Sequence, residues 1–320
     1  MPVIDMPLEK LLTYKGTNEC PPDFEEYWDS SIAEMKALGT AYTLIEENMG
    51  IPQVKCYNMF FTGVGGSKIH CRLAVPAKID KPIPAVCIYH GYSSHCGSFF
   101  SLIGWAAAGF AAVAMSCRGQ GGLSEDLTCV RGTTFRGHIV RGLNDPDPKN
   151  LYYRRVFLDA AQLAGIMMSM DEVDAGRVGA TGVSQGGGLA LACAALTPEL
   201  NRVAPMISFL SDYRRVWDMD MDINAYAELR EFFRNFDPEH KHEKEIFTKL
   251  GYIDNHNLAH RIKAKVLMFT GLIDNVCPPS TQFAVYNNIT SSKDIVLYPD
   301  YGHEVVIGSD DKCLEFFLGM

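Results

Sequence analysis

Residues 177–196, RVGATGVSQGGGLALACAAL, carry a pattern that two different classes of enzyme share. Residues 182–186, G-V-S-Q-G, fit G-x-S-x-G, the turn that presents a serine nucleophile at the end of a strand. Residues 181–188 also fit T-G-x-x-x-G-x-G, a glycine turn that can hold the pyrophosphate of a nicotinamide dinucleotide. The same stretch therefore predicts either an attacking oxygen or a phosphate-binding loop.

The position of the turn argues against the dinucleotide. Such a glycine turn normally follows the first strand of its domain, and an acidic residue ends the next strand about 20 residues later. Here at least four strand candidates precede the turn, and the acidic residue at that distance, Glu199, follows a predicted helix. No Y-x-x-x-K motif of short-chain dehydrogenases lies downstream. We therefore do not expect hydride transfer.

The residues around Ser184 favour the nucleophile. Residues 177–182 predict a strand, and residues 186–196 predict a helix directly behind the serine. The glycines at 182, 186 and 187 leave room for a strained turn. A helix that starts here also directs backbone N–H groups, and the positive end of its dipole, at a developing oxyanion.

The rest of the chain predicts an α/β-hydrolase fold. Further strand candidates, most of them separated by helical patterns, lie at 83–90, 109–117, 202–210, 263–271 and 293–300. This alternation predicts a mostly parallel sheet with helices on both faces. Apolar runs on either side of the turn at 63–66 predict an antiparallel hairpin, which makes the sheet mixed.

We expect the 320 residues to form one domain, residues 1–320, with three additions to the sheet. Residues 1–50 form an N-terminal extension with an amphipathic helix. Residues 123–150 are a polar loop insertion rich in Gly and Pro, and loops of this length are usually functional. Residues 212–250 are charged and helical, and we expect them to form a cap-like segment.

Composition excludes several classes of partner. A formal net charge of −9 argues against nucleic acid, because binding phosphates requires clustered Lys and Arg. No run of about eighteen apolar residues predicts a membrane span. The first residues carry acids where a signal peptide needs basic residues and an apolar run, so we expect a cytoplasmic protein. Its ten cysteines form no C-x-x-C pair and are expected to be reduced.

A serine nucleophile needs a base. In α/β-hydrolases the triad follows the order Ser, Asp or Glu, His. Of the histidines after Ser184, only His303 follows a strand candidate, 293–300. The others lie in charged helical segments and are expected at the surface; they are His240, His242, His256 and His260. His240 and His242 lack a third ligand, so we predict no metal site.

The acid and the oxyanion hole follow from strand ends. Asp274 comes directly after the apolar strand 263–271, whereas Asp254 lacks a preceding strand and Asp300 lies too close to the base. The tripeptide His-Gly-Tyr at 90–92 ends an early strand, and a second oxyanion donor is expected in that loop. We assign the backbone N–H groups of Tyr92 and Gln185. For the side chains of His90 and Tyr92 we expect ordinary packing.

In combination, these motifs resemble carbohydrate esterase family seven, the cephalosporin-C deacetylase and acetyl xylan esterase group of α/β-hydrolases. The resemblance extends over nearly the whole chain. It rests on PPDFEEYW (21–28), HGY (90–92), RGQGG (118–122), YYRRVFLDA (152–160), DEVDAGRVGATGVSQGGGLAL (171–191), GLIDNVCPPST (271–281) and GHE (302–304). R-G-Q, G-x-S-Q-G and H-E in this order are specific to the family.

The resemblance implies Ser184 as nucleophile, His303 as base and Asp274 as orienting acid, with the Tyr92 and Gln185 amides as oxyanion hole. It implies an enzyme without cofactor or metal that removes acetyl groups from xylo-oligosaccharides and cephalosporin-C-like esters through an acetyl-enzyme. It also implies a hexamer with active sites facing an internal cavity.

At one position the chain departs from many relatives. Ser116 stands where they have Asp, two residues before the R-G-Q arginine. This difference bears on local hydrogen bonding more than on the chemistry, because we expect Arg118 and Gln120 to support the nucleophile turn from beneath. Glu304 is likewise expected to be structural.

Three alternatives stay open. The first alternative is another enzyme of the same fold, a short-chain carboxylesterase or a peptidase. The second is a hydrolase-fold binding protein without catalytic activity, since a fold does not fix a function. A thiol enzyme would use Cys96, Cys117 or Cys277, although none of them lies at a strained turn followed by a helix.

Overall fold

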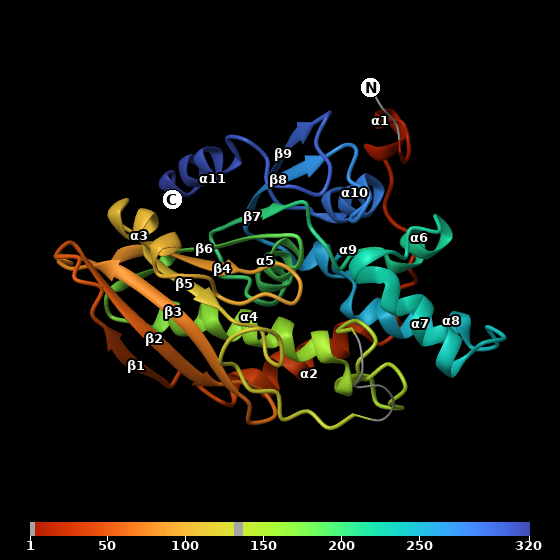
Figure 1. Ribbon diagram of the computed structural model, residues 1–320, viewed down its shortest axis with the longest axis horizontal. Helices are drawn as coiled ribbons and strands as arrows, with labels where there is room; N and C mark the ends of the chain where they lie inside the picture. Colours follow the sequence, from red (N-terminus) through yellow and green to blue (C-terminus); the bar gives the residue numbers. More distant parts are fainter. Residues whose placement is uncertain (1–3, 131–136) are drawn as a thin grey trace.

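The computed structural model describes residues 4–130 and 137–320, so residues 131–136 of the predicted loop insertion and the first three residues lie outside the described part. Nine strands form one sheet within it, in the order β1-β2-β3-β5-β4-β6-β7-β8-β9 (Figure 1). They are β1 (Tyr42–Glu47), β2 (Val54–Thr62), β3 (Lys68–Pro76), β4 (Ile83–Tyr89), β5 (Ala111–Met115), β6 (Val173–Val183), β7 (Arg202–Met206), β8 (Lys265–Gly271) and β9 (Lys293–Tyr298).

The sheet is mixed, as predicted. Strands β1, β2, β3 and β5 pair antiparallel in that order, and all later pairs are parallel. The hairpin of β2 and β3 forms around the predicted turn. The edge strand β1 was not predicted, because most of its side chains are exposed and give no apolar alternation. Backbone pairing with β2 defines it.

The described helices are α1 (Leu8–Leu11), α2 (Phe24–Lys36), α3 (Phe100–Ala107), α4 (Tyr152–Ser169), α5 (Gln185–Leu196), α6 (Tyr213–Asp218), α7 (Ala227–Phe236), α8 (Glu243–Leu250), α9 (Asn255–Leu258), α10 (Pro279–Asn288) and α11 (Ser309–Leu318). One face of the sheet shares a buried core with α2, α4 and α5, and the other with α3 and α11. This arrangement confirms the predicted layers.

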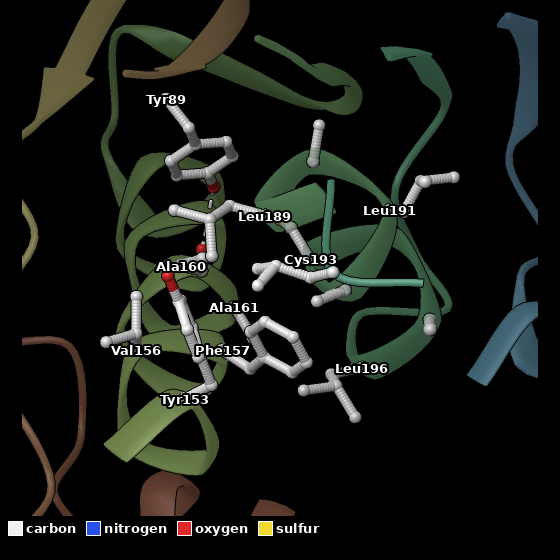
Figure 2. Packing of buried hydrophobic residues seen from close by; sticks show 14 of the residues in the cluster. Tyr89, Tyr153, Val156, Phe157, Ala160, Ala161, Leu189, Leu191, Cys193 and Leu196 are labelled. Atoms are coloured by element: carbon white, nitrogen blue, oxygen red, sulfur yellow. Dashed lines mark hydrogen bonds between the residues drawn. The ribbon is translucent and has the colours of Figure 1, made fainter. Parts of the chain in front are cut away.

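Helices α4 and α5 form the core beneath the nucleophile turn. Figure 2 shows Phe157 of α4 beside Cys193 and Leu196 of α5, with Tyr89 from the end of β4 pointing toward α4. The Tyr89 hydroxyl donates to the carbonyl of Ala160 at 2.9 Å (Figure 2). A hydroxyl buried with a partner avoids the desolvation cost of an unpaired polar group. The strand end that leads to the site is therefore fixed to α4.

The cap-like segment, residues 212–250, contains α6, α7 and α8. Figure 1 shows these helices together at one end of the molecule, opposite the end that holds the hairpin of β2 and β3. Helix α1 of the N-terminal extension lies beside α10 (Figure 1). None of the helices in the described part is both long and apolar enough to cross a bilayer.

Candidate active site

The nucleophile turn connects β6 to α5. Ser184 has φ 58° and ψ −117°, a backbone conformation that residues other than glycine rarely adopt. A Cβ on Gly186 would lie 2.0 Å from the Tyr89 carbonyl oxygen, and one on Gly182 would lie 2.6 Å from the same atom. Both positions therefore require glycine. As predicted, the serine stands between a strand and the first residue of a helix.

The structure brings the three predicted triad residues together. Ser184 Oγ lies 2.9 Å from His303 Nε2, and His303 Nδ1 lies 2.9 Å from Asp274 Oδ2. Asp274 follows β8 and His303 follows β9. Because these neighbouring strands are parallel, both residues lie at the carboxyl ends of the strands, where the serine also lies. Hydroxyl, imidazole and carboxylate form one continuous chain of hydrogen bonds. This geometry suits proton transfer from the serine to the imidazole.

Asp274 is fully buried, and each of its oxygens has a defined partner. Oδ1 accepts the backbone N–H groups of Val276 at 2.9 Å and Cys277 at 2.8 Å. Oδ2 faces His303, with the Gln282 amide at 3.5 Å. Two N–H donors on one oxygen fix the rotation of the carboxylate. Oδ2 therefore stays directed at the imidazole.

The two amides assigned to the oxyanion hole lie on segments that hydrogen bonds hold in place. Helix α5 begins at Gln185, and the first N–H groups of a helix have no partner within it. The Gln185 side chain is buried and accepts the Tyr153 hydroxyl at 2.8 Å and the Gln120 amide at 2.9 Å. Gln120 also accepts the N–H of Ser93, the residue after Tyr92, at 2.9 Å. Gln120 therefore links both segments.

The R-G-Q arginine is also a support. Arg118 forms a buried two-point ion pair with Asp159 of α4, with N–O distances of 2.7 and 2.6 Å. Burial raises the pKa of the Asp159 carboxyl, an effect that the guanidinium opposes. Ser116 is buried, and its hydroxyl accepts the Cys96 N–H at 3.1 Å. The serine thus satisfies a buried backbone donor.

One expectation about the histidines is wrong. His256 is not at the surface: it is 6 % exposed, and its Nδ1 lies 2.7 Å from Asp254 Oδ1. Asp254, the rival acid, also accepts the backbone N–H of Asp212 at 2.8 Å. Asp212 in turn accepts the Tyr14 hydroxyl at 2.6 Å, from the N-terminal extension. The charged sequence around His256 predicted a surface position. The structure instead has a buried polar network there, which holds the N-terminal extension in place.

The side chain of Tyr92 also departs from the expectation of ordinary packing. Its hydroxyl donates to Oε1 of Glu228, on α7, at 2.6 Å. Glu228 is 5 % exposed, and burial raises its pKa to about 7. No sequence pattern singled out Glu228, because one Glu in a charged amphipathic helix predicts a solvated position.

Within the described ranges, one group of side chains has metal-binding chemistry. Ligand atoms of Asp274, Cys277 and His303 lie within 4.8 Å of one another. Asp274 and His303 already bond to each other, and burial raises the pKa of the Cys277 thiol well above its ordinary value. Because metals bind the thiolate, this set fits a triad better than a metal centre. Burial likewise raises the pKa of the Cys117 thiol, which argues against this residue as a nucleophile.

Comparison with known proteins identifies the family of the chain. The model of the family "Acetyl xylan esterase (AXE1)" matches residues 1–319. The crystal structure of acetyl xylan esterase 1 from a Thermoanaerobacterium species is 53 % identical, with a TM-score of 0.97 and 99 % coverage of both chains. The acetyl xylan esterase from a Paenibacillus species is 35 % identical, with a TM-score of 0.93, over 98 % of this chain and 99 % of that one.

A more distant curated relative is the acetyl esterase Axe7A of Xylanibacter ruminicola. It is 25 % identical over 291 residues, which cover 88 % of this chain and 63 % of the relative, so the chain spans under two thirds of that protein. These matches confirm the predicted family, the fold and the class of ester hydrolases. The chain belongs to the acetyl xylan esterase family.

Proposed function

We propose that the protein is a serine esterase that removes acetyl groups from small acetylated sugars such as xylo-oligosaccharides. The observation that carries the proposal is the unbroken hydrogen-bonded chain from Ser184 through His303 to Asp274 on a strained turn. Membership of the acetyl xylan esterase family supports the substrate class. A binding protein would not need this geometry.

In the first half of the reaction, Ser184 Oγ attacks the acetyl carbonyl carbon while His303 Nε2 takes the hydroxyl proton. The Asp274 carboxylate stabilises the imidazolium and holds Nδ1 as the donor. The tetrahedral intermediate collapses to the acetyl-enzyme when the imidazolium gives its proton to the departing sugar oxygen. In the second half, His303 takes a proton from a water that attacks the acetyl carbonyl, the bond from Ser184 Oγ to the acetyl carbon breaks, and the imidazolium returns the proton to Oγ as acetate leaves.

The backbone N–H groups of Tyr92 and Gln185 are the proposed oxyanion hole. Support comes from the position of Gln185 at the start of α5, where a free N–H and the helix dipole favour negative charge. Tyr92 follows the end of β4, next to the strand that carries the serine. Preorganised donors of this kind are each worth about 10²–10³ in turnover.

Three further features remain proposals, the first two of them drawn from the resemblance. We propose activity on cephalosporin-C-like acetyl esters, a hexameric assembly and a cytoplasmic location. The exposed edge strand β1, with Ile45 54 % exposed, offers a surface for assembly. All ten cysteines are free thiols, which suits a reducing compartment. Light scattering coupled to size exclusion tests the assembly.

The test of the function is acetate release from a panel of esters. The panel holds acetylated xylo-oligosaccharides, cephalosporin C, and the p-nitrophenyl esters of acetate, butyrate and octanoate. We expect turnover of the acetyl esters, a loss of activity as the acyl chain lengthens, and loss of turnover in Ser184→Ala. Preference for octanoate contradicts the deacetylase, and wild-type turnover by Ser184→Ala contradicts the serine mechanism.

A further inference from the structure

We propose that Glu228 is a positioning residue for the oxyanion hole. Its carboxyl group, carried by helix α7 of the cap-like segment, holds the ring of Tyr92 and thereby sets the direction of the Tyr92 backbone N–H. The inference rests on the proposed function, in which that N–H stabilises the oxyanion. Glu228 acts through Tyr92 and touches no reacting atom.

The contact between the two side chains is short and buried. The Tyr92 hydroxyl donates to Glu228 Oε1 at 2.6 Å, and Glu228 is 5 % exposed. Hydrogen bonds that involve an ionised group are shorter and about twice as strong as neutral ones. Since the tyrosine side chain and its own backbone N–H belong to one residue, fixing the hydroxyl restricts the orientation of the amide.

The second oxygen of Glu228 binds a different segment. Oε2 accepts the backbone N–H of Val140, in the loop insertion, at 3.0 Å. The loop approaches so closely that a Cβ on Gly137, which has φ 81°, would lie 1.9 Å from Oε2. One carboxyl group therefore joins the cap-like segment, the loop insertion and the residue that carries the oxyanion donor.

The remaining contacts of Tyr92 lead to the nucleophile turn. Its ring meets Phe209 edge-on, with ring centroids 5.8 Å apart and planes at 86°. The N–H of Phe209 donates to the Ser184 carbonyl at 3.0 Å. On another side the ring packs against His138, whose Nε2 lies 3.1 Å from the Ser93 hydroxyl. The Tyr92 ring thus lies between Glu228 and the residues that support the serine.

The test is a double-mutant cycle on p-nitrophenyl acetate hydrolysis at about pH 8, with Tyr92→Phe, Glu228→Gln and the double variant. Tyr92→Phe keeps the ring and the amide but removes the hydroxyl. In Glu228→Gln the amide oxygen must face Val140, because the Val140 N–H can only donate a hydrogen bond. The NH2 group of the glutamine therefore faces the Tyr92 hydroxyl. A weaker neutral hydrogen bond then replaces the short one.

We expect Tyr92→Phe to lower kcat between about 10- and 100-fold, less than the loss of a whole donor, with little change in KM. Glu228→Gln should lower kcat about fivefold, in keeping with the weaker bond. The double variant should be no slower than Tyr92→Phe, because Glu228 acts only through the hydroxyl. Glu245→Gln, an exposed carboxylate of the same segment, is the matched control and should retain wild-type kcat.

Losses that multiply in the double variant would overturn the inference, and so would wild-type kcat in both single variants. A lower melting temperature with unchanged kcat would show a merely structural role and would also overturn it. Ser184→Ala is measured alongside. If that variant retains turnover, the proposed function itself fails, whereas an inactive Ser184→Ala with an unaffected cycle rejects only the role of Glu228.

Discussion

Replacing Asp274 by Asn should leave the fold intact and nearly abolish turnover. In the wild type, Oδ1 accepts two backbone N–H groups, from Val276 and Cys277. The amide oxygen of Asn must take that place, because an NH2 group there would face two donors. The NH2 group then faces His303 Nδ1, which has to become an acceptor. The imidazole proton moves to Nε2, where it faces Ser184 and blocks proton transfer.

We expect kcat to fall about 10⁴-fold, the loss for a triad whose imidazole is held in the wrong tautomer. Each factor of ten corresponds to about 1.4 kcal/mol, so the barrier should rise by about 5 kcal/mol. The assay is steady-state hydrolysis of p-nitrophenyl acetate, with a thermal melt to confirm folding. Asp300→Asn, an exposed acid just before the base, is the matched control and should retain full activity. A folded Asp274→Asn enzyme within tenfold of wild type would refute the tautomer argument.

Three further outcomes follow from the packing and the titration of buried groups. Gly186→Ala places a methyl group against the Tyr89 carbonyl and should lower the free energy of unfolding by about 3 kcal/mol, as chemical denaturation would measure. Arg118→Met leaves the buried Asp159 unpaired and should cost about 3–5 kcal/mol in the same measurement; a smaller cost would show that water or another group solvates the carboxylate. Burial raises the pKa of Glu228 to about 7, so the folded protein binds this proton more tightly than the unfolded chain, and the resulting stability is present at low pH and lost as the pH rises through about 7. Between about pH 4.5 and 8 the wild type should therefore lose up to about 3 kcal/mol relative to Glu228→Gln, and parallel pH profiles of the two would contradict the raised pKa.

The parts of the site that the sequence predicted are those with a local cause. The turn at Ser184 needs glycines at fixed offsets, and Asp274 and His303 each follow an apolar strand, so pattern and order were enough to find them. The mixed sheet followed from strand-helix alternation and one hairpin. Each of these features depends on residues near one another in the chain.

The parts that were missed depend on distant contacts. Glu228 contacts Tyr92, which lies 136 positions away in the chain, and the N-terminal extension packs against His256, where a Cβ on Gly16 would lie 2.7 Å from the imidazole ring. Strand β1 is defined by backbone pairing along the sheet edge and has no apolar pattern of its own. Periodicity reports the face that a residue presents, but it does not report which other segment covers that face.

The central claim is that the hydroxyl of Ser184 is the nucleophile. The most direct measurement is titration with a fluorophosphonate, followed by peptide mass mapping and an assay of acetyl-ester hydrolysis on the same sample. We predict one adduct per chain, on Ser184, with hydrolysis falling in proportion to labelling. An adduct on another residue, or hydrolysis that persists in fully labelled protein, would contradict the claim.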